Sequence, residues 1–399
     1  MDRRAVIAEI ESALPLAREL AAKGDNLGNF AAVVGPDGLR VPRFATLCDC
    51  LSAQPEFQQS GGFFIGVSGG ATFAPGTACR PLLEIALKEG PAPAVAWLEK
   101  VFATSRSDVR YVTELRGISV PPCGLKVGKV LFLPWQDQPI TPTAKHLGGV
   151  YSQPAGLYTL PPPTVALMVM LGVPVTGTRA EIGDQERQAA HAQAAANVAG
   201  TLLALTAAID SAWSIGRSWY DFVDPDLQAA QLGFMWQDPP PEAPPPYGAT
   251  ELTPDHAAFA ARYLALSGKL RRKVDIASAR LNLARRRASL GDKALEASIA
   301  LEALLGDDDR FDLTYKLRLR AALLIQGDVD ARQKAMRTIG DFYNLRSGVV
   351  HGSIADPKPE SAETVSQALA ICVEVLRRLV DHGKVPIWQK LELSGGKEL

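Results

Sequence analysis

Hydrophobic residues recur at three- and four-residue spacings through most of the chain after residue 252, as on the buried face of amphipathic helices. This spacing predicts helices over 253–267, 270–289, 293–305, 311–325, 328–345 and 360–380. Thr253 and Pro254 form a typical helix start, and glycines follow several of the predicted ends. The short loops between these segments predict an antiparallel all-α helical bundle over residues 251–385.

The first 180 residues follow a different pattern, with short β-branched or aromatic runs between helical segments. An N-terminal helix runs toward Lys23 and Gly24, and a strand pair flanks the turn residues 35–38. Further strands are predicted at 63–65, 109–115 and 127–133, and short helices at 81–88 and 93–102. Residues 1–180 are therefore predicted to be an α+β domain of unknown role.

A connecting region over residues 181–237 separates the two predicted domains. Its first part has a helical spacing of apolar residues from Asp184 to about Ile215. Its second part is rich in aromatic residues, namely Trp213, Trp219, Tyr220, Phe222 and Trp236. This aromatic cluster favours an interface between two domains over a ligand-binding site. Residues 238–250 contain two proline triplets and predict a semi-rigid linker, with a recruiting site for a proline-binding domain as the alternative.

Composition narrows the class of protein. The 399-residue chain has a formal net charge of -1, so any contact with nucleic acid requires a local basic patch. Its five cysteines are thinly spread, which favours reduced thiols and a cytoplasmic protein, and Cys48 and Cys50 lack the second ligand pair of a zinc site. The longest apolar run, 165–173, is far shorter than the roughly 20 residues of a membrane helix.

The second predicted helix of the bundle is strongly basic. Six of its cations are candidates for contact with RNA phosphates: Arg271, Arg272, Lys273, Arg285, Arg286 and Arg287. A solvated helix face that pairs with the acidic loop 307–309 is an equal alternative.

An arginine and a histidine stand close together near the end of the fifth predicted helix. Arg346 and His351 are about 140° apart around an unbroken helix axis, so Gly348 is expected to end the helix and let both side chains face one pocket. A guanidinium can hold two phosphate oxygens, and an imidazole can transfer a proton near neutral pH. Such a pair suits attack of a ribose 2'-hydroxyl on the adjacent phosphate, without a metal ion.

Residues 343–352, Tyr-Asn-Leu-Arg-Ser-Gly-Val-Val-His-Gly, resemble the signature of HEPN domains of the Apea-like branch. Residues 292–305 and 319–324 resemble other helices of that branch, and the resemblance covers about 252–380. It implies a metal-independent endoribonuclease without a cofactor, which forms a homodimer so that two motifs build one site. Toxin and antiviral defence proteins occur in this family, and the first domain would then sense a trigger.

Carried over by this resemblance, the catalytic residues are Arg346 and His351, with Ser347 at the polar position. The supporting residues would be Tyr343, Asn344, Glu302 and Asp292. Serine departs from the asparagine, aspartate or histidine that the family often has after the arginine. The alternative function is a non-catalytic module for dimerisation or nucleic-acid binding.

One further motif lies in the first domain. Residues 66–70, Gly-Val-Ser-Gly-Gly, match the pattern of a hydrolase nucleophile elbow. The residues that follow, 71–76, are a poor helix start, so a glycine-rich turn is predicted instead.

Overall fold

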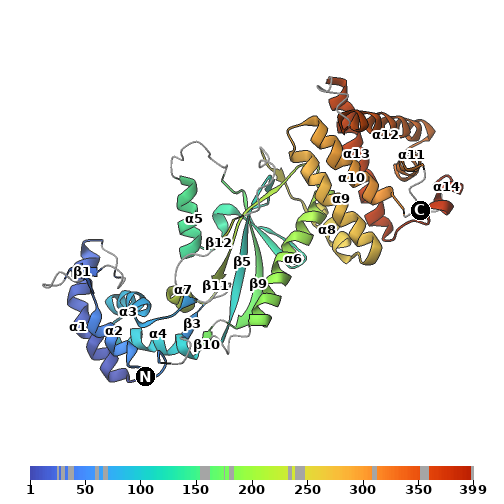
Figure 1. Cartoon of the computed structure of the whole chain (residues 1–399). Helices are drawn as coiled ribbons and strands as arrows, with labels where there is room; N and C mark the ends of the chain where they lie inside the picture. The colour runs from blue at the N-terminus through green and yellow to red at the C-terminus, as the bar shows by residue number, and fades with distance from the viewer. Residues whose placement is uncertain are drawn as a thin grey trace.

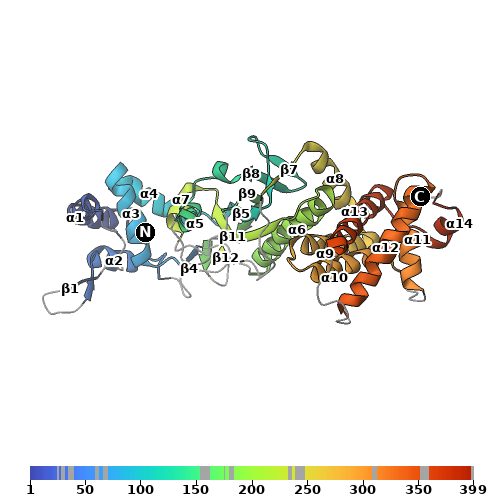
Figure 2. The same cartoon turned by 90° about the horizontal axis from the view of Figure 1, so that it is seen from above.

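The computed structural model describes residues 1–24, 27, 32–34, 40–58, 63–65, 71–152, 162–174, 176–178, 184–231, 236–238, 248–307, 312–350 and 359–396. The molecule is elongated, and its parts follow one another in chain order from one end to the other (Figure 1). A helical part lies at the N-terminal end, a sheet lies in the middle and a helical bundle lies at the C-terminal end, as the view from above also shows (Figure 2). The expected mixed α+β region followed by a helical region is confirmed.

The N-terminal part is built from four helices: α1 (Arg3–Ala22), α2 (Ala45–Ser52), α3 (Pro75–Glu89) and α4 (Pro91–Ala103). The side chain of Asp2 caps α1 by accepting hydrogen bonds from the backbone amides of Arg4 and Ala5. Apolar residues at helical spacing, from Val6 to Leu20, face the other helices. The N-terminal helix is confirmed, whereas α3 begins at Pro75 instead of the expected residue 81, because proline is well tolerated in a first helical turn.

Two small sheets accompany these helices. The expected strand pair is present as β1 (Ala32–Val34) and β2 (Arg40–Pro42), and its turn at 35–38 lies outside the described residues. Strand β3 (Phe63–Ile65) pairs antiparallel with β4 (Ala71–Thr72) and with β10 (Thr176–Thr178). Residues 66–70 lie outside the described residues, but they join two antiparallel strands, whereas a nucleophile elbow joins a strand to a helix.

The middle part is a sheet of six strands in the order β12-β11-β5-β9-β8-β7, with every neighbouring pair antiparallel. The strands are β5 (Arg106–Arg116), β7 (Leu125–Val127), β8 (Val130–Pro134), β9 (Val165–Pro174), β11 (Ser214–Phe222) and β12 (Trp236–Gln237). The long apolar run of the sequence is β9, which lies between β5 and β8. Its first five residues are buried, which explains why both of its faces are apolar there.

The single strand expected over 127–133 is wrong. The chain instead makes a tight hairpin, in which β7 and β8 pair at Val127 and Val130. Gly128 lies in the turn with a φ of 59°, a left-handed conformation that glycine adopts without strain. The apolar residues on both sides of the turn made the two strands resemble one.

The interpretation of residues 213–222 as part of a connecting seam also needs correction, because β11 belongs to the sheet. It pairs with β5, with a register shift between Ile215 and Ser218. Gly216 lies in this shift, where an added Cβ would stand 2.2 Å from Oε2 of the buried Glu114. The backbone amide of Arg217 donates to the same carboxylate oxygen at 2.9 Å. The glycine therefore allows β11 to close over a buried acid.

Helices cover both faces of the sheet. Helix α5 (Pro142–Ser152) places Ala144 and Leu147 in a small apolar cluster with Met168 and Trp219. Helix α6 (Asp184–Ala208), the helix expected from Asp184 onward, packs against β9 and β8 and also contacts the C-terminal bundle. Figure 1 shows α6 reaching from the sheet to the bundle.

The carboxyl end of α6 is held by two arginines of the bundle. Nη1 of Arg285 donates to the carbonyl oxygens of Thr206 and Ser211 at 2.9 and 3.1 Å. Nε of Arg377 donates to the carbonyl oxygen of Ala207 at 2.8 Å. These carbonyls have no partner inside the helix, so the arginines act as a cap supplied by another domain. Burial lowers the pKa of Arg285 to about 10, which leaves it charged at neutral pH.

The side chain of Asn282 in α9 binds both the backbone amide and the backbone carbonyl of Trp213, which lies in the segment after α6. The amide oxygen of Asn282 accepts from the backbone amide of Trp213 at 3.1 Å, and its Nδ2 donates to the Trp213 carbonyl oxygen at 3.2 Å. Asn282 is 4% exposed. The sheet and the bundle are therefore joined by buried polar contacts as well as by chain connectivity.

The C-terminal part is a bundle of helices, as expected. Its members are α8 (Pro254–Ala265), α9 (Gly268–Arg286), α10 (Leu290–Leu305), α11 (Leu313–Leu324), α12 (Val329–Val350), α13 (Pro359–His382) and α14 (Trp388–Leu393). Helix α10 packs against α9, α11, α12 and α13. The side chain of Thr253 accepts from the backbone amide of His256, which confirms the expected start of α8. The short helix α14 was not anticipated.

The predicted linker is described only at its ends. The proline triplets lie within 239–247, outside the described residues. Immediately after them, β13 (Thr250–Glu251) pairs in parallel with β6 (Ile118–Ser119), so the chain entering the bundle is bound to the sheet domain. None of the helices in the described part of the chain is long and apolar enough to cross a membrane.

Candidate active site

The candidate motif lies on the last turns of α12. Ala335, Ile339, Phe342 and Leu345 are buried at helical spacing, which fixes the side of α12 that faces the bundle. The helix continues through Gly348 to Val350, so the expected helix end at Gly348 is wrong. His351 follows directly and lies outside the described residues. A change of chain direction between Arg346 and His351 could therefore begin only after Val350.

Tyr343 connects α12 to α10. Its hydroxyl donates to Oε1 of Glu302 at 3.5 Å and to the carbonyl oxygen of Ser298 at 3.4 Å. Burial and the nearby Glu302 carboxylate raise the pKa of Tyr343, against a smaller opposing effect of Arg346. The phenol therefore remains a neutral hydrogen-bond donor, and a tyrosine, a carboxylate and an arginine meet at this place.

Arg346 is half-buried beside this group. Its Nε is buried and has no hydrogen-bond partner among the described residues. An unsatisfied buried donor is costly and calls for an explanation. The Nε atoms of Arg287, Arg332 and Arg378 share this feature among the described residues, so it does not single out Arg346 by itself.

Ser347 and Asn344 belong to another side of α12. Both are exposed, and three residues of helix bring them to within about 60° of each other. Tyr343 and Arg346 are related in the same way on the half-buried side. Because Ser347 is about 100° from Arg346 around the axis, its hydroxyl does not join the group formed by Arg346, Tyr343 and Glu302.

The two upstream acids do not come together. Asp292 is exposed in the first turn of α10, where its backbone amide donates to Oγ of Ser289. Glu302 is ten residues further along the same helix, a rise of about 15 Å. Glu302 alone contacts Tyr343, so the structure separates Asp292 from the candidate site.

The basic helix α9 does not present the expected patch. The six cations in question are Arg271, Arg272, Lys273, Arg285, Arg286 and Arg287, and only Arg272 among them is exposed. Arg286 is 8% exposed, and Arg285 caps α6 as described above. The alternative expectation, a solvated face paired with the acidic loop 307–309, is not tested, because residues 308 and 309 lie outside the described residues.

The remaining cations of α9 bind acceptors within the protein. Nε of Arg271 donates to both carboxylate oxygens of Asp275 at 2.8 and 2.9 Å. Nζ of Lys273 donates to the carbonyl oxygen of Gly306 at 2.7 Å, at the carboxyl end of α10. Nη2 of Arg287 donates to the buried Glu296 at 3.0 Å. The charge of α9 therefore mainly stabilises the bundle.

The described residues contain no group of three or more His, Cys, Asp or Glu side chains that could hold a metal ion. Sequence reasoning also missed a charged hollow in the N-terminal part, lined by Arg80, Glu84 and Lys88 of α3. Their four-residue spacing places them on one side of a helix and was a signal that could have revealed it.

Comparisons with protein-family models, with curated proteins and with solved structures gave no match.

Proposed function

We propose that the C-terminal bundle is a HEPN-type endoribonuclease that cleaves RNA without a metal ion, with Arg346 and His351 as its catalytic pair. The observation that carries the proposal is the buried Nε of Arg346, which has no partner among the described residues and lies beside Tyr343 and Glu302. The sequence places His351 directly after the helix that carries Arg346.

In this mechanism the ribose 2'-hydroxyl loses its proton to a base and attacks the neighbouring phosphorus. The bond between phosphorus and the 5'-oxygen breaks, the departing oxygen takes up a proton, and a 2',3'-cyclic phosphate remains. His351 transfers protons, and Arg346 stabilises the negative charge that builds on the phosphate oxygens. The hydrogen bond from Tyr343 to Glu302 joins α12 to α10 near Arg346.

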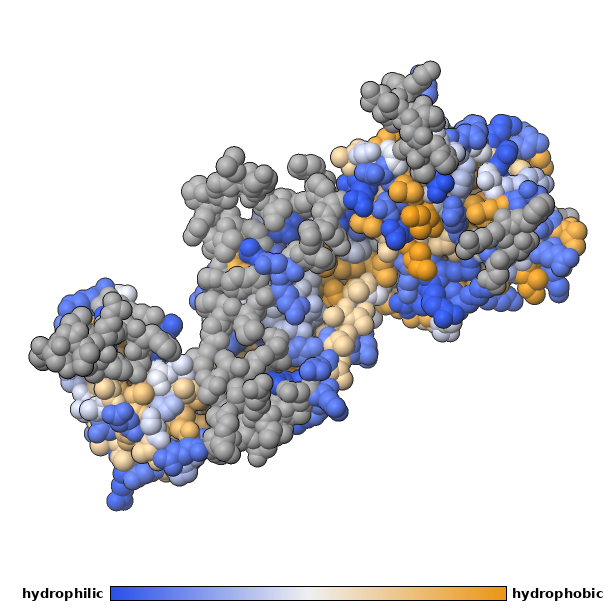
Figure 3. Space-filling view, viewed as in Figure 1, coloured by the Kyte–Doolittle hydropathy of each residue, from blue (hydrophilic) through white to orange (hydrophobic). Residues whose placement is uncertain are grey.

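A homodimer would bring two such motifs together. Hydrophobic side chains reach the surface of the bundle (Figure 3). Among them are Ile276 on α9 and Leu295 on α10, 51% and 37% exposed on helices that pack against each other. The same surface favours the second candidate function, a non-catalytic dimerisation module. The acceptors already bound by α9 argue against a module whose main role is nucleic-acid binding through that helix.

The two functions are separated by an RNA cleavage assay in EDTA with the full chain. We expect Arg346→Ala to reduce the rate by about 100- to 1000-fold and His351→Ala by about 100- to 10,000-fold. Arg337→Ala is the matched control, because Arg337 is an exposed arginine on the same helix. Equal cleavage by all four proteins, or cleavage by none, would refute the catalytic proposal and leave the dimerisation module.

A further inference from the structure

A surface hollow of about 510 Å³ lies in the N-terminal part, between the end of α1 and one side of α3. It is lined by Ala21, Gly24, Leu27, Arg80, Glu84, Leu87 and Lys88. Helices α1 and α3, which line the hollow, lie at the opposite end of the molecule from α12 (Figure 1), so the hollow is separate from the proposed ribonuclease site.

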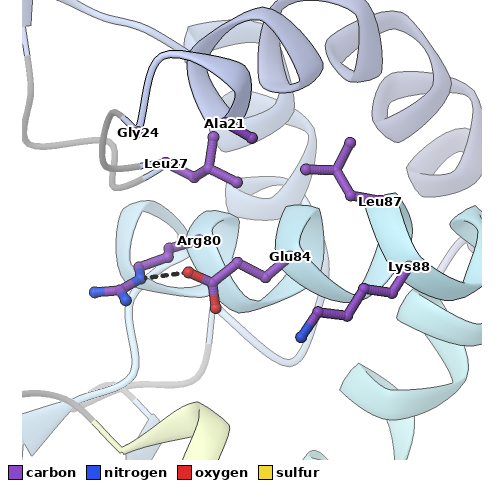
Figure 4. A pocket seen from close by; sticks show the side chains of 7 residues that line it. All are labelled: Ala21, Gly24, Leu27, Arg80, Glu84, Leu87 and Lys88. Atoms are coloured by element: carbon purple, nitrogen blue, oxygen red, sulfur yellow. Dashed lines mark hydrogen bonds and ion pairs between the residues drawn. The ribbon is translucent and has the colours of Figure 1, made fainter.

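The lining has an apolar side and a charged side. Figure 4 shows Leu27 and Leu87 near Ala21 on one side, and the ends of Arg80, Glu84 and Lys88 along the other. Leu27 is 5% exposed and belongs to the hydrophobic core, whereas Leu87 is half-buried. An apolar group placed here would extend the core and remove the exposed part of Leu87 from water.

The charged side carries two cations and one acid. Nε of Arg80 donates to Oε1 of Glu84 at 2.8 Å, and both side chains are largely exposed. Such exposed pairs contribute little, so Arg80 can turn to another acceptor at small cost. Lys88 has no ion pair among the described residues, although it lies on the same side of α3. The excess charge of this side is therefore positive.

The positions of the cations fix the orientation of a bound molecule. Ala21 and Gly24, which line the hollow on the side of Leu27, carry no charged side chain. An anionic group is favoured near Lys88 and Arg80, so the apolar end of the molecule would lie between Leu27 and Leu87.

From this arrangement we infer that the hollow binds a small amphipathic anion, a molecule with one carboxylate or phosphate head and an apolar body. The head pairs with Lys88 and Arg80, and the body covers Leu87 and Leu27. This inference does not depend on the proposed ribonuclease function.

Isothermal titration calorimetry of the full chain tests the inference, with decanoate as the probe below its micelle-forming concentration. Decanol and decyltrimethylammonium have the same apolar chain with a neutral or a cationic head. We expect saturable binding of decanoate, at least tenfold weaker binding of decanol, and no binding of the cation. Equal affinity for decanoate and decanol, or no decanoate binding, would overturn the inference.

Variants locate the binding in the hollow. Lys88→Glu is expected to weaken decanoate binding at least tenfold, Lys88→Gln to weaken it less, and Leu87→Ser to weaken it about tenfold. Arg18→Glu is the matched control, since Arg18 is exposed on α1, does not line the hollow and undergoes the same charge change. An equal loss in Arg18→Glu and Lys88→Glu would overturn the assignment, because it would indicate a general charge effect.

Anionic vesicles distinguish a free ligand from a membrane surface. We expect no co-sedimentation of the protein with phosphatidylglycerol vesicles. Sedimentation that Lys88→Glu abolishes, without saturable binding of free decanoate, would refute a small-molecule site and indicate a lipid surface instead.

Discussion

Helix α9 and the end of α12 both carry arginines, but they use them differently. On α9 the guanidinium groups of Arg271 and Arg285 bind acceptors within the protein. On α12 the Nε of Arg346 is buried without a partner among the described residues. The availability of a guanidinium therefore matters more than the number of cations, because an arginine already bound by carbonyls or carboxylates cannot hold a phosphate without breaking those bonds.

The largest effect on stability is expected from a bound arginine outside α9. Arg320 of α11 is 3% exposed and donates to Glu392, to the carbonyl oxygen of Leu305 and to Asp307 at 2.6 to 2.8 Å. Arg320→Ala leaves these acceptors unpaired and should lower the free energy of unfolding by about 3–5 kcal/mol in urea denaturation. Arg337→Ala is the control. A similar loss of unfolding free energy in both variants would contradict the distinction between a buried, bound arginine and an exposed one.

A smaller loss is expected within α9 itself. Arg285→Met keeps much of the side-chain volume but removes the donors that cap α6, which should cost about 1.5–3 kcal/mol. Arg272→Met changes an exposed residue of the same helix and should stay within about 0.5 kcal/mol. Urea denaturation at pH 7 compares them. If the two variants unfold alike, Arg285 does not stabilise the junction.

The surroundings of Arg285 also predict a response to alkaline pH. Burial raises the pKa of Cys372 from 9.0 to about 12, with Arg285 opposing it. Between these values the unfolded chain has lost the thiol proton and the folded chain has kept it, so stability falls as pH rises. The difference in free energy of unfolding between wild type and Cys372→Ala should decrease by about 1.4 kcal/mol from pH 8 to pH 10.

The matched control for this measurement is Cys123→Ala, which removes an exposed thiol. Its gap to wild type is expected to stay constant over the same pH range. A constant gap for Cys372→Ala as well would show that the buried thiol loses its proton as readily as the unfolded one.

The smallest effect on stability is expected at Arg346. Because its buried Nε has no partner among the described residues, Arg346→Met should change the free energy of unfolding by no more than about 0.5 kcal/mol. The same variant should lose RNA cleavage, as proposed above. A loss of several kcal/mol would instead place Arg346 with the structural arginines of α9.

The helices of the bundle could be predicted because their signals are local. Thr253 and Pro254 begin α8, and glycines end several helices, so periodicity and capping were sufficient. The sheet was harder. Strand β11 reads as an aromatic cluster until it is paired with β5, and that pairing joins residues about a hundred positions apart. No local pattern contains this information.

The candidate site shows the same limit. The position of Arg346 on a helix was expected, but Asp292 was wrongly grouped with Glu302 because both acids occur in one resembling segment. The cations of α9 were misread because their acceptors are mostly distant. The carbonyls that Arg285 binds near the end of α6 lie more than seventy residues earlier, and the Gly306 carbonyl that Lys273 binds at the end of α10 lies 33 residues later. The number of cations can be counted in a sequence, whereas the carbonyls and carboxylates that bind them are known only from the fold.

The cap that Arg285 and Arg377 supply to α6 also determines where the chain can be divided. A fragment that begins at Leu252 would retain both arginines and Asn282 but lose the backbone groups that they bind. It would also expose the apolar residues of α8 and α9 that α6 covers. A C-terminal fragment that folds on its own must therefore start no later than Asp184, so that it includes α6. This helix also packs against β8 and β9 of the sheet domain.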